Sequence, residues 1–192
     1  MIIKSYILEQ NISSLNNYKI VLFYGENLGL KHEFKNKLKN ENQPNEILNF
    51  VQDEIFKSKE RFMTGIKNQS LFSTKKVILI SQANEKILEI LIEVENYLEN
   101  DKIYVFSENL DKKSKLRSHF EKGKNIGIVP CYSDNEITIK NILISKLKDF
   151  KGVSNEVLNL IIKSTNLDRN KVNNEIEKIE SLFTNKIIDP DK

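Results

Sequence analysis

Cysteine and histidine are scarce in this chain of 192 residues. Cys131 is the only cysteine, and His32 and His119 are the only histidines. One cysteine excludes an intrachain disulfide, and a four-ligand zinc site would need other residues. Both histidines lie in lysine-rich helical patterns, so we interpret them as exposed helix residues. Cys131 ends an apolar run, where a small buried side chain is expected. We predict no metal site, and no Ser-His-Asp grouping suggests nucleophilic catalysis.

Long apolar runs and a large excess of one charge are also missing. No stretch approaches the roughly 18 to 20 apolar residues that span a bilayer. The opening "MIIKSYILEQ" has polar residues too early for a signal peptide. The formal net charge of +3 neither requires nor excludes a nucleic-acid partner. With 39% apolar and 30% charged residues, we expect a cytoplasmic protein with a real core and no membrane partner.

Strand-like and helix-like patterns alternate through the first two thirds of the chain. Apolar runs typical of buried strands occupy 19–24, 76–80, 102–106 and 125–132. Helical spacing occupies 29–39, 53–66, 85–98 and 111–122, whereas 46–50 fits a strand or a short helix. This alternation predicts an α/β fold with a mainly parallel sheet that helices cover on both sides.

The strand signal disappears after Tyr132. Three helices are predicted, at 134–150, 154–165 and 168–183. Ser154 and Asp168 are candidate N-caps, and Gly152 is a candidate break between the first two helices. No internal repeat or low-complexity linker is visible. We therefore expect an α/β domain over 1–134 and a small three-helix domain over 135–192.

The turn after the first strand, "YGENLGLKHEF", is the first place to look for an active site. A strand, glycines and a helix with an early lysine make up a P-loop, which holds phosphates through backbone N–H groups. Here Gly25 and Gly29 are one residue too close for the P-loop spacing, and Lys31 does not follow Gly29 directly. His32 stands where a Mg²⁺-binding hydroxyl belongs, and Glu26 adds negative charge. We predict a degenerate phosphate loop that binds no nucleotide.

The segment 111–124 carries six lysine or arginine residues against two acidic ones. Such a run could follow DNA phosphates. It could equally be the solvated face of a helix whose Leu116 and Phe120 point into the core. We favour the solvated face, because no aromatic residues are interleaved for base stacking.

An apolar pair stands out just before one predicted strand, in "QSLFSTKKVILI". Leu71 and Phe72 lie between polar residues in a segment that reads as a loop. Loops usually run over the surface, so these two side chains either pack under the sheet or bind a partner. The residues of this segment alone leave both interpretations open.

The order of these features resembles the delta subunit of the bacterial DNA polymerase III clamp loader. The resemblance is carried by five stretches: "VLFYGENLGLKHE", "QSLFSTKKVILI", "VFSENLDKKSKLRSHFE", "IVPCYSDNE" and "TNLDRNKVNNEIEKIESLF". It covers nearly the whole chain, although no single motif is highly specific. It implies an AAA+-like α/β domain and a small helical lid, with an all-helical collar expected beyond Lys192. It also implies a subunit that does not bind ATP.

The same resemblance implies a function and a set of partners. Leu71 and Phe72, led by Gln69 and Ser70, match the tip that enters a hydrophobic pocket of the β sliding clamp. The chain would promote ring opening for loading onto primed DNA, with no cofactor and no catalysis of its own, as part of a DNA polymerase holoenzyme. Implied partners are the delta prime and gamma/tau subunits and, through the assembled complex, primer–template DNA. Two alternatives remain: a P-loop-type ATPase or nucleotide kinase with a divergent loop at 25–32, and a nucleic-acid-binding module.

Overall fold

The computed structural model describes residues 1–43, 45–68 and 75–188. It divides into two compact units. The first, which we call the α/β unit, comprises Met1–Glu26 and Lys31–Cys131. The second, the helical unit, comprises Asn27–Leu30 and the chain from Tyr132 onward. Among the described residues, no helix is both long and apolar enough to cross a membrane.

A five-stranded sheet forms the centre of the α/β unit. Its strands are β1 (Ile20–Tyr24), β2 (Glu46–Val51), β3 (Lys76–Ala83), β4 (Lys102–Ser107) and β5 (Ile126–Pro130). They pair in parallel in the order β2-β3-β4-β1-β5, which confirms the predicted parallel α/β sheet. The stretch 46–50, which fitted two structures in the sequence, forms the edge strand β2. Val77 to Ile80 are fully buried, as expected when helices cover both faces.

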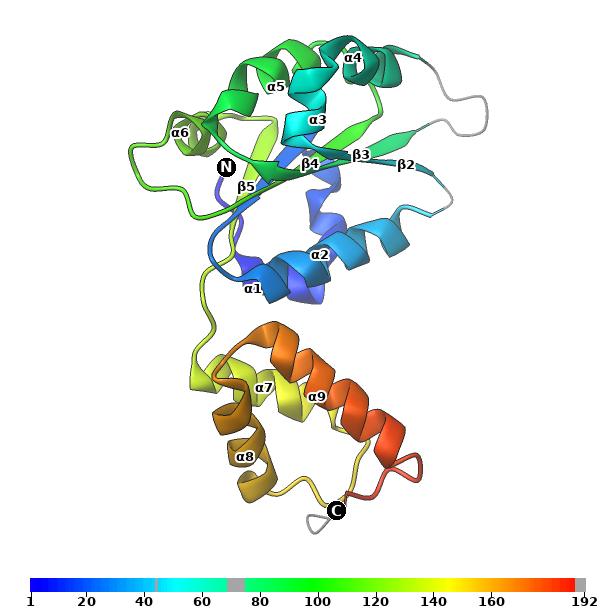
Figure 1. Cartoon of the computed structure of the whole chain (residues 1–192), viewed down its shortest axis with the longest axis vertical. Helices are drawn as coiled ribbons and strands as arrows, with labels where there is room; N and C mark the ends of the chain where they lie inside the picture. The colour runs from blue at the N-terminus through cyan, green and yellow to red at the C-terminus, as the bar shows by residue number, and fades with distance from the viewer. Residues whose placement is uncertain (44, 69–74, 189–192) are drawn as a thin grey trace. The chain divides into compact units, whose positions relative to one another are not determined.

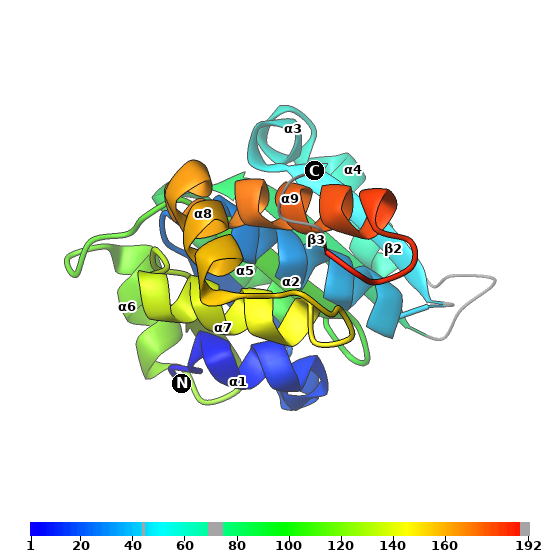
Figure 2. The ribbon, with the colours of Figure 1, turned by 90° about the horizontal axis from the view of Figure 1, so that it is seen from below.

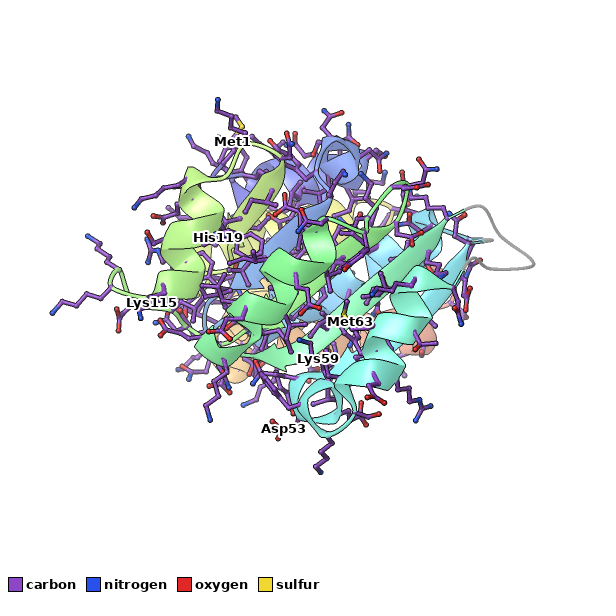
Figure 3. The ribbon with its side chains drawn as sticks, turned by 90° about the horizontal axis from the view of Figure 1, so that it is seen from above. Met1, Asp53, Lys59, Met63, Lys115 and His119 are labelled. Atoms are coloured by element: carbon purple, nitrogen blue, oxygen red, sulfur yellow. The ribbon has the colours of Figure 1, made fainter. Side chains whose placement is uncertain are left out.

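Helices lie on both faces of this sheet (Figures 1 and 3). One face carries α3 (Gln52–Lys57), α4 (Lys59–Lys67), the 3₁₀ turn η2 (Glu85–Ile87), α5 (Leu88–Glu95) and α6 (Lys115–Lys122). The other face carries α1 (Ser5–Gln10), the 3₁₀ helix η1 (Ile12–Asn17) and α2 (Leu28–Glu41). Figure 3 looks onto this first face, with His119 of α6 on the left and Met63 of α4 on the right.

Each face of the sheet has its own core. Leu116 and Phe120 of α6 are buried in the cluster that includes Ile20 and Leu22 of β1, so their predicted inward orientation is confirmed. On the other face, the Phe23 ring stacks on Phe106 with centroids 4.9 Å apart. Phe23 also lies 5.5 Å from the ring of Phe34 on α2. Alternating residues of β1 thus serve the two cores.

The structure differs from the sequence prediction in one place of the α/β unit and adds two elements for which there was no prediction. The stretch 53–66, predicted as one helix, is divided at Ser58, whose φ of −146° and ψ of 67° are not helical. Serine competes with helical hydrogen bonding, and Lys57 suits the last turn of a short helix. The first 17 residues, for which no structure was predicted, form α1 and η1. Leu8 and Leu15 are fully buried there.

The helical unit contains α7 (Glu136–Lys146), α8 (Asn155–Thr165) and α9 (Arg169–Leu182), each in contact with the other two (Figure 2). Their shared core consists of Ile139, Leu143, Leu147, Leu158, Ile161, Val172 and Ile176. Both predicted N-caps are confirmed: Ser154 Oγ accepts a hydrogen bond from the Val157 N–H, and Asp168 Oδ1 accepts from Asn170 and Lys171. Gly152, with a φ of +84°, lies between α7 and α8, as predicted.

Candidate functional site

The loop after β1 is held tightly between the ends of its neighbouring strands. The Cys131 N–H donates to the Tyr24 carbonyl at 2.7 Å, and the Gly25 N–H donates to the Glu108 carbonyl at 3.2 Å. Gly25 has a φ of +129°, and a Cβ atom there would lie 2.2 Å from the Cys131 carbonyl oxygen. Only glycine fits this close approach. Gly25 is therefore required by the packing of the strands themselves.

Lys31 points into the α/β unit. Its side chain is almost fully buried, and its ammonium group donates to the carbonyl oxygens of Gly25 and Ser107, each at 2.7 Å. Burial lowers the pKa of Lys31, and the nearby carboxylates of Glu108 and Glu26 partly oppose that shift. The lysine that would neutralise phosphate in a P-loop instead connects this loop to the end of β4.

The first turn of α2 is capped by a side chain of the same chain. Asn27 Oδ1 accepts a hydrogen bond from the Leu30 N–H at 2.9 Å. The amide nitrogen of Asn27 donates to the Tyr132 carbonyl at 3.1 Å and to Asp134 Oδ2 at 2.8 Å. N–H groups at a helix start otherwise attract anions, including phosphate. Here an internal amide oxygen accepts one of these hydrogen bonds.

A buried ion pair adjoins this cap within the helical unit. Arg169, the first residue of α9, binds Asp134 through two nearly parallel hydrogen bonds, Nε to Oδ2 at 2.8 Å and the second guanidinium nitrogen to Oδ1 at 2.7 Å. Their side chains are only 1% and 5% exposed. Bidentate pairing is the geometry by which arginine also binds phosphate. An internal carboxylate therefore already occupies the guanidinium group of Arg169.

Gly29 lies against the same part of α9. A Cβ atom at Gly29 would be 2.7 Å from Arg169 Cβ and 2.9 Å from the Asn170 nitrogen. The glycine therefore permits close packing of the first turns of α2 and α9. This role explains a glycine at this position without any bound phosphate.

The structure brings Gly25 and Lys31 together as the sequence suggested, but in structural roles. Gln69, Ser70, Leu71 and Phe72 lie outside the described residues. His32 is exposed as predicted, whereas His119 is partly buried and packs edge-on against Phe120. Cys131 is a buried free thiol, also as predicted. Across 1–43, 45–68 and 75–188, no cluster of His, Cys, Asp or Glu could hold a metal ion.

Sequence reasoning missed three residues of this region: Asn27, Asp134 and Arg169. Asp134 marked only an approximate domain boundary, and Arg169 was not singled out within the predicted helix 168–183. Asn27 precedes the predicted helix, which is an N-cap position, and that signal could have identified its role. The pairing of Asp134 with Arg169 depends on residues 35 positions apart and leaves no local signal.

Comparison with known proteins gives similarity in structure alone. No protein-family model matches the sequence, and no curated protein matches it. The DNA clamp loader delta protein (YqeN) of Bacillus subtilis superposes with a TM-score of 0.64, covering 96% of this chain and 59% of that one at 12% identity. This chain has the fold of a clamp-loader delta subunit.

Two further solved structures share this fold. A RuvB variant of Thermotoga maritima has a TM-score of 0.55 at 18% identity, covering 97% of this chain and 63% of that one. A chain of Drosophila ORC bound to DNA has a TM-score of 0.50 at 14% identity, covering 94% and 55%. The present chain thus spans less than two thirds of the delta protein and of both these structures. At these low sequence identities, the structural similarity shows the fold alone.

The packing of Gly25 predicts opposite effects for two glycine substitutions. Gly25→Ala should lower the free energy of unfolding by at least about 2 kcal/mol, because of its positive φ and the clash with Cys131. Gly65→Ala is the control: it lies within α4, and its added Cβ would meet only Leu48 Cδ1 at 4.0 Å. The control should raise stability by about 1 kcal/mol. Urea denaturation measures both, and equal effects would contradict the packing role.

The ion pair predicts a large loss of stability in Asp134→Ala. Removing the carboxylate takes two hydrogen bonds from a buried guanidinium, which should cost about 3 to 5 kcal/mol. Asp168→Ala removes another carboxylate of the same unit, the N-cap of α9, and should cost about 1 kcal/mol. Denaturation of the two variants gives the comparison. A similar cost in both would mean that the buried pair contributes no more than a cap.

Proposed function

We propose that this chain is the clamp-binding part of a clamp-loader delta subunit. The observation that carries the proposal is the similarity to the Bacillus subtilis delta protein over 96% of this chain. The sequence adds the Leu71–Phe72 pair, in the connection between α4, which ends at Lys67, and β3, which begins at Lys76. The partner is the β sliding clamp, and Gln69 to Phe72 form the binding segment.

The physical basis of this interaction is the burial of two large apolar side chains. Leucine and phenylalanine that lose all contact with water can each contribute on the order of 2 kcal/mol. Such pairs act as hot spots when a hydrophobic pocket of the partner receives them. Gln69 and Ser70 supply a polar approach to the pair.

Ring opening follows if the chain binds the open clamp more tightly than the closed one. A bound protein shifts an equilibrium only by its differential affinity for the two states. This step consumes no ATP. In the assembled loader, ATP belongs to the gamma/tau subunits, and contact with primer–template DNA is made through the complex, which also contains delta prime.

The rival function, an ATPase or nucleotide kinase, receives no support from the loop at 25–32. In the α/β unit, a phosphate would have to compete with the Gly25 and Ser107 carbonyls for Lys31. Separately, in the helical unit, Asp134 already binds Arg169. Each of these groups is already satisfied at hydrogen-bonding distance. Nucleotide binding would therefore require several buried bonds to break at once.

We expect that Mg-ATP at millimolar concentration will not change the melting temperature of the wild-type chain. A ligand present at 100 times its dissociation constant should stabilise a fold by about 2.7 kcal/mol, which is easily detected. Thermal denaturation with and without Mg-ATP tests this, with Mg²⁺ alone as the control. Stabilisation that requires the nucleotide would favour the enzyme.

The proposed anchor predicts that Leu71→Ala/Phe72→Ala strongly weakens clamp binding and leaves the fold intact. Truncating both side chains should cost at least about 3 kcal/mol, more than a hundredfold in the dissociation constant. The measurement is titration with the sliding clamp of the same organism, alongside a melting curve of the variant.

A matched control removes two other exposed leucines. Leu160 on α8 and Leu182 on α9 are 69% and 63% exposed, so Leu160→Ala/Leu182→Ala should bind the clamp normally. If the Leu71/Phe72 variant still binds, the anchor lies elsewhere. If it melts far below the wild type, the pair belongs to the core.

A further inference from the structure

Lys76 is a buried lysine whose ammonium group is bound by the end of a helix. The residue is 4% exposed, and its Nζ donates to the carbonyl oxygens of Gly65 at 2.7 Å and Ile66 at 3.3 Å. It also donates to the carbonyl of Asn68. These carbonyls belong to the last turn of α4 and its C-cap, where helical hydrogen bonding ends and partial negative charge accumulates. Lys76 therefore caps the C-terminus of α4.

The backbone of Lys76 is fixed independently by the sheet. Lys76 is the first residue of β3 and pairs with Glu46 of β2. Its N–H donates to Asp101 Oδ1 at 2.7 Å. One residue thus joins the start of β3 to the end of α4. Asn68 precedes the segment 69–74 and Lys76 follows it, so the hydrogen bond between them joins the chain before and after this segment.

We propose that Lys76 is a positioning residue for clamp binding, holding together the two ends of the segment that carries Leu71 and Phe72. This inference rests on the proposed function. A segment whose ends are fixed has fewer conformations to lose when it binds, and the cost of closing it is already met in the free protein. Preorganisation of this kind raises affinity without any contact between Lys76 and the clamp.

Lys102 offers a matched comparison on the adjacent strand. It is the first residue of β4, and its ammonium group donates to the Asn16 and Tyr18 carbonyls at 2.7 and 2.8 Å. Like Lys76, it joins the start of a strand to a chain connection at the amino ends of the parallel strands. Its partners, however, are Asn16 in the last turn of η1 and Tyr18 in the connection between η1 and β1. The two lysines therefore share chemistry and differ in the segment that they hold.

The experiment compares Lys76→Met with Lys102→Met in titrations against the sliding clamp of the same organism. Methionine keeps the apolar stem and removes the charge and its hydrogen bonds. Lys76→Met should bind the clamp about tenfold more weakly, whereas Lys102→Met should stay within about twofold of the wild type. Both should lose thermal stability, so stability alone does not produce the difference in affinity.

A double-mutant cycle then separates positioning from a direct contact. If Lys76 acts through the apolar pair, Lys76→Met added to Leu71→Ala/Phe72→Ala should cause no further loss of the residual affinity. A further tenfold loss in that background would overturn the positioning role. If Lys76→Met is unfolded at the assay temperature, Asp101→Ala replaces it, because it releases the Lys76 N–H and should weaken binding in the same direction.

The outcomes distinguish this inference from the function on which it rests. Wild-type affinity in Lys76→Met, with binding lost in Leu71→Ala/Phe72→Ala, would overturn the role of Lys76 alone. Equal losses in Lys76→Met and Lys102→Met would also overturn it, because they would reflect general destabilisation. A wild-type chain that does not bind the clamp would overturn the proposed function and this inference together.

Discussion

The hydrogen bonds from Lys31 to the Gly25 and Ser107 carbonyls hold the carboxyl ends of β1 and β4 together. A lysine ammonium is costly to remove from water unless other groups replace the lost hydrogen bonds. Two carbonyls at 2.7 Å do so here, and burial lowers the pKa of Lys31. With the lysine used in this way, the loop after β1 is part of the core.

The same chemistry recurs at the opposite end of the strands, where they begin. Lys76 and Lys102 begin β3 and β4, and Lys19 directly precedes β1. Each donates to backbone carbonyls of a neighbouring connection: Lys76 to the end of α4, Lys102 to the end of η1, and Lys19 to Leu98 at 2.6 Å. At both ends of the parallel strands, lysines thus hold the connections by donating to backbone carbonyls and not to carboxylates.

The degenerate phosphate loop and the residues that flank the proposed binding segment lie at opposite ends of the parallel strands. Gly25 and Lys31 lie where β1 ends, at the carboxyl edge of the parallel strands. Asn68 and Lys76 lie where β3 begins, at the amino edge. In a parallel sheet, the amino and carboxyl ends of the strands are a full strand length apart. A chain that binds a partner through 69–72 can therefore lose nucleotide chemistry without altering the surface that binds.

Local patterns allowed most of the fold to be predicted from the sequence. The runs that became β1, β3, β4 and β5 are apolar because helices bury both of their faces, and such runs are readable without tertiary information. The interruption at Ser58 was not predicted, since the hydrophobic spacing of 53–66 continues across it. α1 and η1 were also missed, because each has only six residues, too few to show a sustained helical period.

The candidate site was predictable in position and less so in role. Gly25, Gly29 and Lys31 drew attention through their resemblance to a P-loop, and their poor spacing predicts that the loop binds no nucleotide. What they do instead depends on atoms far away in sequence: Lys31 reaches Ser107 across 76 positions, and Asn27 reaches Asp134 across 107. Contacts of this kind appear only when the chain is folded.

A site whose ligands are its own side chains has consequences for regulation. Nucleotide can drive a conformational change only if it binds one state better than another. Within the α/β unit, Lys31 is already bound by two carbonyls, so under the proposed function nucleotide at this loop would supply no such difference. Under the proposed function, any control of clamp binding must therefore come from another protein that covers or exposes the binding segment. The contact between Asn68 and Lys76 would suit that arrangement if Lys76 has the positioning role proposed above.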